Sequence, residues 1–226
     1  MPPAKIDKSI REKMIAPVFI LQKPLLLASA SPRRRQLLAA VGIDCPVHPA
    51  SIDEKHLAHE SGENYVRRLA AEKALAVAGS FPESFVLAAD TVVLSGKRLL
   101  GKPSSSQEAA RMLAGLAGKT HRVLTAFCLR QEASGLHIVD CVASKVRFAA
   151  WSADTLAAYA ACGEPLDKAG AYGIQGAGAF LAAGVFGSSS NVIGLPLAEI
   201  IRLFLDLGIV IPAVAPAAPT PCVRNE

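Results

Sequence analysis

A strand and a helix meet in the stretch Leu25-Leu-Leu-Ala-Ser-Ala-Ser-Pro-Arg-Arg-Arg-Gln-Leu-Leu38. The apolar run predicts a buried strand over residues 24–29. Ser31 is a typical N-cap residue and Pro32 suits the first helical position, so a helix is predicted to start there and run to about Val41. The arginines of its first turn lie at the positive end of the helix dipole, where positive charge is unfavourable unless an anion binds. Backbone N–H groups, serine hydroxyls and guanidinium groups would together hold phosphate; the alternative is an ordinary solvated basic turn.

Helix and strand patterns alternate along the rest of the chain. Helices are expected over 62–79, from Ser105 to about Leu116, from Ser152 to about Cys162 and from Pro196 to Leu207, and strands over 85–94, 121–130 and 136–149. This alternation implies an α/β protein with a mixed sheet. One domain is expected over residues 24–208, preceded by an extension over 1–23 and followed by a loose Ala- and Pro-rich tail over 209–226.

The composition is typical of a chain that can build a large hydrophobic core. Of its 226 residues, 51% are hydrophobic and 19% are charged, which argues against disorder. No run approaches the roughly 18 uncharged apolar residues of a membrane helix, and the N-terminus lacks the apolar core of a secretory signal. The five cysteines form no CxxC pair, which favours reduced thiols over disulfides or a zinc site. We therefore expect a cytoplasmic protein, and its net charge of +5 fits an anionic ligand without demanding nucleic acid.

One carboxylate lies inside an apolar strand. Asp90 interrupts the run Val86-Leu-Ala-Ala-Asp-Thr-Val-Val-Leu94, and its burial is costly unless it is paired, binds a metal or faces a cleft. Lys73 lies on the apolar stripe of the helix over 62–79 and is the natural counter-charge. The alternatives are a structural salt bridge for Asp90 and a lysine that extends to solvent for Lys73.

Three other stretches carry candidate ligand-binding residues. Lys102 follows Gly101, which leaves the chain free to turn, and precedes Pro103, which stiffens it; a lysine placed in this way suits contact with phosphate. The glycine-rich loop around Gln175 lets the backbone approach a ligand, and its amide can read the edge of a base. Asp53 and Glu54 could hold a divalent metal through oxygen ligands. The alternatives are a lysine in a surface turn, an irregular loop and a solvated acidic pair, but the whole inventory favours a phosphorylated, metal-chelated small molecule over a peptide or a sugar.

Six short motifs follow one another over about residues 24–205. They are Ala28-Ser-Ala-Ser-Pro-Arg-Arg34, Val66-Arg-Arg-Leu-Ala-Ala-Glu-Lys-Ala74, Ala89-Asp-Thr-Val92, Gly101-Lys-Pro103, Gly163-Glu-Pro-Leu-Asp-Lys-Ala-Gly-Ala-Tyr-Gly-Ile-Gln175 and Asn191-Val-Ile-Gly-Leu-Pro-Leu197. Each motif alone is modest, but in this order they resemble the Maf family of nucleoside triphosphate pyrophosphatases, in its dTTP/UTP subfamily.

The resemblance implies an α/β fold with a mixed twisted sheet and flanking helices, in which two lobes surround a central cleft, similar to inosine triphosphate pyrophosphatases. It also implies a homodimer and a reaction that splits a nucleoside triphosphate between its α and β phosphates, with magnesium or manganese as cofactor. Monophosphate and pyrophosphate would be the products. We expect water to attack the α-phosphorus, with Asp90 as a metal ligand or as the acceptor of the water proton.

The family motifs assign roles to nine residues of this sequence. The resemblance implies Asp90, Lys73 and Lys102 as catalytic residues, Ser29, Arg33, Arg34, Thr91 and Gln175 as substrate-binding residues, and Glu54 with Asp90 as metal ligands. Among the substrate-binding residues, Arg33, Thr91 and Gln175 fall at positions associated with the choice of base.

Two alternatives stay open beside the dTTP/UTP assignment. The subfamily that acts on 7-methyl-GTP typically has Trp or Leu at the position of Arg33 and a different loop at Gly163. The other interpretation is that the protein is a nucleotide-binding regulator of septum formation and cell division. Ala89 departs from the family pattern, which usually has a glycine before the catalytic aspartate, and we expect its methyl group to be tolerated.

Overall fold

The computed structural model describes residues 16–213 of the chain. Its centre is a six-stranded sheet in the order β2-β3-β5-β6-β7, with β4 paired to β3 outside this path. The strands are β2 (Leu25–Leu27), β3 (Phe85–Ser95), β4 (Arg98–Leu100), β5 (Thr120–Gln131), β6 (Leu136–Phe148) and β7 (Ala182–Phe186). β2 and β3 run parallel, whereas the other neighbouring strands of this sheet run antiparallel, so the predicted mixed sheet is confirmed.

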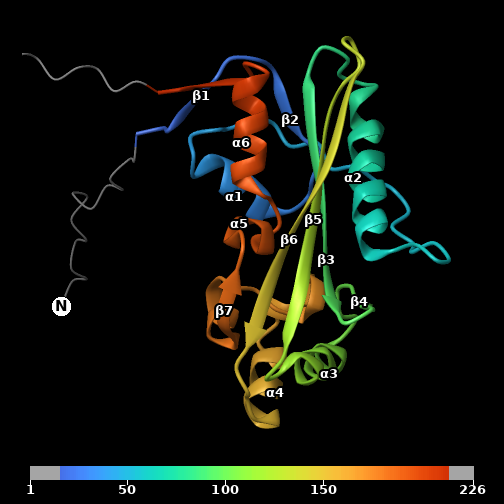
Figure 1. The fold of residues 1–226 in the computed structure, drawn as a ribbon, viewed down its shortest axis with the longest axis vertical. Helices are drawn as coiled ribbons and strands as arrows, with labels where there is room; N and C mark the ends of the chain where they lie inside the picture. The colour runs from blue at the N-terminus through green and yellow to red at the C-terminus, as the bar shows by residue number, and fades with distance from the viewer. Residues whose placement is uncertain (1–15, 214–226) are drawn as a thin grey trace, which may run out of the picture.

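The long strands β3, β5 and β6 run along the molecule and join two lobes (Figure 1). The helices are α1 (Pro32–Ala39), α2 (Gly62–Ala78), α3 (Ser106–Leu116), α4 (Ala153–Ala161), α5 (Ser189–Ile193) and α6 (Leu197–Asp206). In one lobe α2 covers one face of the sheet, and α1, α5 and α6 lie on the other side (Figure 1). The second lobe holds α3 and α4 together with β4 and β7 (Figure 1). The two-lobed α/β architecture therefore agrees with the expectation.

Alternate side chains of β3 enter different cores, because successive residues of a strand point to opposite faces of the sheet. Val86 and Ala88 pack with the apolar stripe of α2. Leu87 and Ala89 pack with α1 and α6 in the core on the other face. Farther along the strand, Val93 joins the separate core of α3 and α4. One continuous strand thus supports both lobes.

Asp90 and Thr91 lie where the outer edge of β3 changes its partner. β2 pairs with Phe85–Leu87 and β4 pairs with Val93–Ser95. Within residues 16–213, no strand pairs with the segment between these two contacts on that edge. Strand alternation places the side chain of Asp90 on the face that α2 covers and that of Thr91 on the opposite face. This opening in the sheet edge separates the lobes and gives a ligand access to both side chains.

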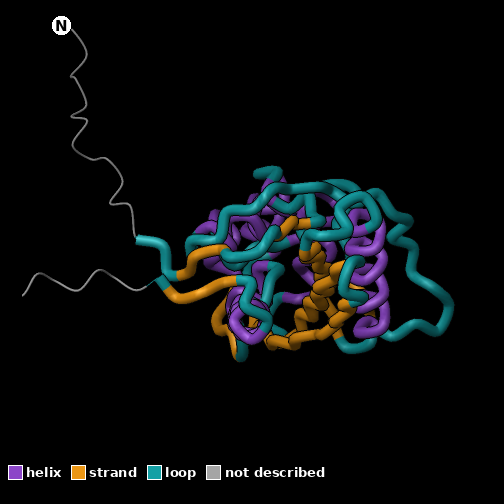
Figure 2. Tube along the Cα trace, turned by 90° about the horizontal axis from the view of Figure 1, so that it is seen from above, coloured by secondary structure: helices purple, strands orange, loops and turns teal. Residues whose placement is uncertain are grey.

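The expected extension and tail each contribute one strand. β1 (Phe19–Leu21) and β8 (Val210–Pro212) form a two-stranded antiparallel sheet, and they lie side by side at the margin of the molecule (Figure 2). The loose tail expected from residue 209 is therefore wrong for these three residues. The rest of the extension, up to residue 15, and the tail from residue 214 lie outside the described residues. No helix in the described part of the chain is long and apolar enough to cross a bilayer.

Two helix caps differ from the sequence expectation. Ser31 is the N-cap residue of α1, but its side chain makes no capping hydrogen bond. The sequence Ser105-Ser-Gln-Glu108 fits a capping box, in which each end residue's side chain accepts the backbone N–H of the other. At α3, Ser105 accepts the backbone N–H of Glu108 as this motif predicts, but the carboxylate of Glu108 accepts the N–H of Ser104 instead of that of Ser105. The start of α1 therefore has no side-chain cap, and its N-cap residue Ser31 lines a cavity.

Candidate active site

Two adjoining cavities occupy the opening between the lobes. The larger has a volume of about 330 Å³ and the smaller about 220 Å³. They share five lining residues, which are Ser31, Arg34, Glu54, Lys73 and Lys102. The two cavities therefore form one pocket with two compartments.

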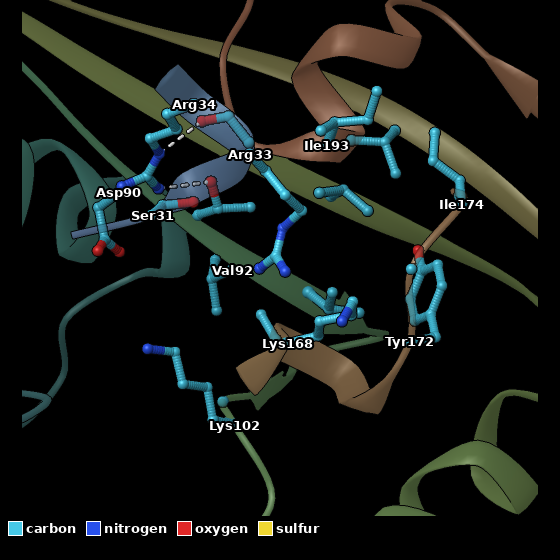
Figure 3. Close-up of a pocket in the computed structure, with 18 of the residues that line it drawn as sticks. Ser31, Arg33, Arg34, Asp90, Val92, Lys102, Lys168, Tyr172, Ile174 and Ile193 are labelled. Carbon is cyan, nitrogen blue, oxygen red and sulfur yellow. Dashed lines mark hydrogen bonds between the residues drawn. The ribbon is translucent and has the colours of Figure 1, made fainter. Parts of the chain in front are cut away.

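The structure brings all nine sequence-predicted site residues to this pocket. The larger compartment is lined by Arg33, Arg34, Glu54, Lys73, Asp90, Thr91, Lys102 and Gln175, and the smaller adds Ser29. Figure 3 shows Asp90 and Lys102 on one side of the pocket, with Tyr172 and Ile174 on the other and Arg33 reaching between them. Segments from most of the chain length thus converge on one opening.

Lys73 joins the two candidate metal ligands. Its Nζ lies 2.6 Å from Oδ1 of Asp90 and 2.7 Å from Oε1 of Glu54. Burial raises the pKa of the Asp90 carboxyl, and the charges of Lys73 and Arg34 oppose this effect only in part. Glu54 is half exposed. Burial also acts to raise its pKa, but the hydrogen bond and charge of Lys73, together with the charges of Lys102 and Arg34, hold the pKa below its usual value. The predicted counter-charge for Asp90 is therefore confirmed, and Asp90 is the carboxylate more ready to take up a proton.

Arg34 is fixed by three acceptors from different parts of the chain. Its Nε donates to the carbonyl of Gly194 at 2.8 Å, Nη1 to Oγ of Ser29 at 3.0 Å and Nη2 to Oγ1 of Thr91 at 3.2 Å. Burial lowers the pKa of the guanidinium, and the charge of Asp90 acts in the opposite direction. Gly194 has a φ of +127°, and a Cβ there would contact both Thr91 and Arg34. A rigid, positively charged group thus faces the shared part of the pocket.

The N-terminus of α1 faces the smaller compartment. Ala28, Ser29, Ala30 and Ser31 line this compartment together with Lys73 and Lys102. The first-turn N–H groups of a helix have no partner within the helix, and here the N-cap side chain supplies none. The compartment therefore combines a helix N-terminus with two lysines, which is an arrangement that binds anions.

A salt bridge joins the two lobes at the pocket, between one residue of each compartment's lining. Nη1 of Arg33 on α1 lies 2.8 Å from Oδ2 of Asp167, at the end of the 3₁₀ helix η1 (Glu164–Asp167). The other oxygen of Asp167 accepts Nζ of Lys168 at 2.7 Å. Burial acts to raise the pKa of Asp167, but its bonds with Lys168 and Arg33 hold the pKa below its usual value. Nothing local in the sequence indicates this salt bridge, because Arg33 and Asp167 are 134 residues apart in the chain.

Glu164 organises the glycine-rich loop that carries Gln175. Its carboxylate accepts the hydroxyl of Tyr159 at 3.0 Å and the backbone N–H groups of Ala177 at 2.8 Å and Gly178 at 3.2 Å. These bonds close the loop onto α4 and onto the 3₁₀ helix η3 (Gly176–Leu181). The sequence did not single out Glu164, because its three partners are known only once the loop is folded.

Apolar side chains make up much of the lining of the larger compartment. They are Val92, Val93, Leu99, Val123, Tyr172, Ile174, Val192 and Ile193. Tyr172 is held in place by its hydroxyl, which lies 2.7 Å from Nε2 of the buried His121. An apolar wall suits a flat base or a sugar, whereas the smaller compartment suits phosphate.

A family profile and two named relatives match most of this chain. A family profile described as Maf-like protein matches residues 24–207. The chain is 52% identical over 192 residues to a dTTP/UTP pyrophosphatase of Myxococcus xanthus, a match that covers 84% of this chain and 96% of the relative. It is 46% identical over 193 residues to a dTTP/UTP pyrophosphatase of Desulfotalea psychrophila, with 85% of this chain and 99% of the relative covered. The solved structure of the Staphylococcus aureus Ham1 protein is similar with a TM-score of 0.48 and 14% identity, over 82% of this chain and 100% of that chain. The match of the family profile and the identity to both relatives over most of the chain establish that this chain belongs to the Maf-like protein family.

Proposed function

We propose that this protein hydrolyses dTTP, UTP and related pyrimidine nucleoside triphosphates to the monophosphate and pyrophosphate. The observation that carries the proposal is the two-compartment pocket, in which an apolar-walled chamber adjoins one lined by a helix N-terminus, Lys73 and Lys102. The names of the similar proteins, which are dTTP/UTP pyrophosphatases, support the choice of substrate.

The base and sugar would occupy the larger compartment and the phosphates the smaller one. Arg33, Thr91 and Gln175 line the larger compartment and would choose the base, while Arg34 lies in both and would hold the phosphates nearest the sugar. Ser29 borders the smaller compartment and would contact the phosphates. The bond between the α and β phosphates would then lie at the junction, close to Asp90.

Glu54 and Asp90 are the residues that would hold a divalent metal. Their oxygens contact the same lysine nitrogen, so both carboxylates face one point in the pocket. The part of the chain that the structure describes has no group of three or more His, Cys, Asp and Glu side chains that could hold a metal. Two carboxylates completed by substrate phosphates are a usual site for magnesium. When bound, magnesium or manganese would neutralise phosphate charge and acidify a water molecule.

The reaction would transfer the nucleotidyl group, which contains the α-phosphorus, from pyrophosphate to water. Water attacks the α-phosphorus, the bond from that phosphorus to the bridging oxygen breaks, and pyrophosphate leaves with both bonding electrons. Asp90 would orient this water and take its proton, a role that the raised pKa of its carboxyl favours. Lys73, Lys102 and Arg34 would stabilise the charge that develops on the phosphate oxygens.

A nucleotide panel tests the proposed function. Purified protein with magnesium or manganese is incubated with dTTP, UTP, CTP, ITP and 7-methyl-GTP, and pyrophosphate release is measured. The proposal expects the fastest release from dTTP and UTP. Binding without turnover would instead support the regulator of septum formation, and a preference for 7-methyl-GTP would support the other subfamily.

We also propose a homodimer in the cytoplasm. The family resemblance supports the dimer. The four cysteines of the described residues are free thiols, which fits a reducing compartment. Light scattering coupled to size-exclusion chromatography would give the mass of the particle and so its number of chains.

A further inference from the structure

Two threonine hydroxyls face each other across the central strands. Thr91 on β3 and Thr125 on β5 are directly opposite in the antiparallel register, and their Oγ1 atoms lie 3.0 Å apart. Thr91 lines the larger compartment, whereas Thr125 is fully buried behind it. Thr125 therefore cannot contact a nucleotide, but it can determine how Thr91 does.

The contacts of Thr125 fix the direction of both hydroxyl protons. Oγ1 of Thr125 lies 2.8 Å from the backbone carbonyl of Asn191, and a carbonyl can only accept. The single proton of Thr125 is therefore committed to Asn191. In the contact between the two threonines Thr125 must accept, so Thr91 donates its own proton to Thr125.

The carbonyl of Asn191 is held in a rigid setting. Asn191 is completely buried, and its Nδ2 donates to the carbonyl of Val123 on β5 at 3.3 Å and to Oγ of Ser144 on β6 at 3.0 Å. Its backbone N–H donates to Oγ of Ser188 at 3.1 Å. Because these bonds tie α5 to β5 and β6, the acceptor for Thr125 has no freedom to move away.

Thr91 is left as an acceptor toward the pocket. Its proton points to Thr125, and one of its two lone pairs accepts Nη2 of Arg34 at 3.2 Å. The remaining lone pair can accept a hydrogen bond, but Thr91 has no proton to offer a ligand. A ligand atom placed against Thr91 must therefore be a donor.

We propose that Thr125 is a specificity-positioning residue, which holds Thr91 as a hydrogen-bond acceptor and so favours bases with a ring N–H over bases with an unprotonated ring nitrogen. The inference rests on the proposed function. Uracil and thymine carry a donor at N3, whereas cytosine carries an acceptor there. Gln175 cannot make this distinction alone, because its amide can rotate to offer a donor or an acceptor. A hydroxyl with a fixed proton cannot adapt in that way.

Substitution Thr125→Val tests the proposal, with Thr125→Ser as the matched control that keeps the hydroxyl. Valine has nearly the shape of threonine but cannot accept the proton of Thr91, which would then be free to donate to N3 of cytosine. The affinities of UMP and CMP are measured by calorimetry, because these nucleotides present the base without turnover. The preference for UMP is expected to fall by about tenfold in Thr125→Val, with CMP binding more tightly, and to persist in Thr125→Ser.

A purely structural role would weaken both nucleotides alike, so an unchanged UMP-to-CMP ratio in Thr125→Val would overturn the proposal. A wild-type protein that does not prefer UMP would also overturn it. Thr91→Val supplies a second check, since Thr125→Val in that background is expected to leave the ratio unchanged. The kcat/KM values for UTP and CTP, measured on the same proteins, test the proposed function separately from the role of Thr125. A wild-type protein that binds UMP selectively but releases no pyrophosphate would contradict the proposed function and leave the role of Thr125 intact.

Discussion

Asp90 combines two properties that conflict in an ordinary protein core. It is 8% exposed within an apolar strand, yet it lies beside a second carboxylate, Glu54, at the same lysine. Burial and the neighbouring negative charge raise the pKa of Asp90, whereas Lys73 and Arg34 lower it. Because the net effect is a raised pKa, Asp90 takes up a proton more readily than a solvated carboxylate does.

Substitution Asp90→Asn is expected to keep the fold and to lower pyrophosphate release by about 100-fold or more, because it removes the charged oxygen around which the reaction is arranged. Turnover of UTP and the melting temperature are measured together. Asp154→Asn, at an exposed position in the first turn of α4, is the matched control and should retain wild-type turnover. A folded Asp90→Asn protein with near-normal turnover would refute the assignment.

Among the elements, α2 does the most to shape the pocket. It buries Lys73 against β3, and through Arg68 and Tyr65 it holds the loop that carries Glu54. Arg68 donates to both oxygens of Glu60 at 2.7 and 2.9 Å, and the hydroxyl of Tyr65 donates to the carbonyl of Glu54 at 2.8 Å. The helix thus sets the position of a candidate metal ligand that belongs to an irregular segment.

The pair of Glu60 and Arg68 predicts a pH-dependent contribution to stability. Hydrogen bonds from Arg68 hold the pKa of Glu60 at about 2, below the unfolded value of about 4.3. A depressed carboxyl pKa stabilises the fold above the unfolded value, and this contribution is lost as the pH falls toward 2. Glu60→Gln should therefore lower the melting temperature by about 2–4 °C at pH 7, with the difference from wild type shrinking below about pH 4. An equal difference at pH 7 and pH 3 would show that the charge of Glu60 is not responsible.

A substitution at Glu164, in the loop between α4 and β7, is expected to change the affinity for the nucleotide rather than the rate of the chemical step. Glu164→Gln replaces one carboxylate oxygen with an NH₂ group, which cannot accept a hydrogen bond. The backbone N–H groups of Ala177 and Gly178 bind different oxygens of Glu164, so one of them loses its acceptor. Because Gln175 lies on this loop, KM for UTP should rise by about tenfold while kcat changes by less than about threefold. Steady-state kinetics of this variant and of the exposed control Glu83→Gln would check it. A fall in kcat at unchanged KM would place Glu164 in the chemical step.

At the scale of the whole molecule, β3 and its two short partners create the site. β2 and β4 pair with opposite ends of one edge of β3, and the interval between them exposes Asp90 and Thr91. The salt bridge between Arg33 and Asp167, at 2.8 Å, then joins the two lobes. The pocket is thus a consequence of the strand pairing, and the helices supply the groups that line it.

The sequence predicts the parts of this arrangement that have local signatures. Ser31 and Pro32 mark the start of α1, and Asp90 and Lys73 stand out as charges in apolar patterns. β4, β7 and α5 were missed, because segments of three to five residues are too short for a periodic pattern. Thr125 was missed for a different reason. A threonine in an apolar strand is unremarkable until the register sets it opposite Thr91, 34 residues away in the chain.

The most direct test of the central claim is the fate of the attacking oxygen. UTP is hydrolysed by the wild-type protein in water labelled with heavy oxygen, and the masses of UMP and pyrophosphate are measured by mass spectrometry. Attack at the α-phosphorus predicts UMP with one heavy oxygen and unlabelled pyrophosphate. Label in the pyrophosphate, or release of inorganic phosphate without UMP, would contradict the account of this pocket.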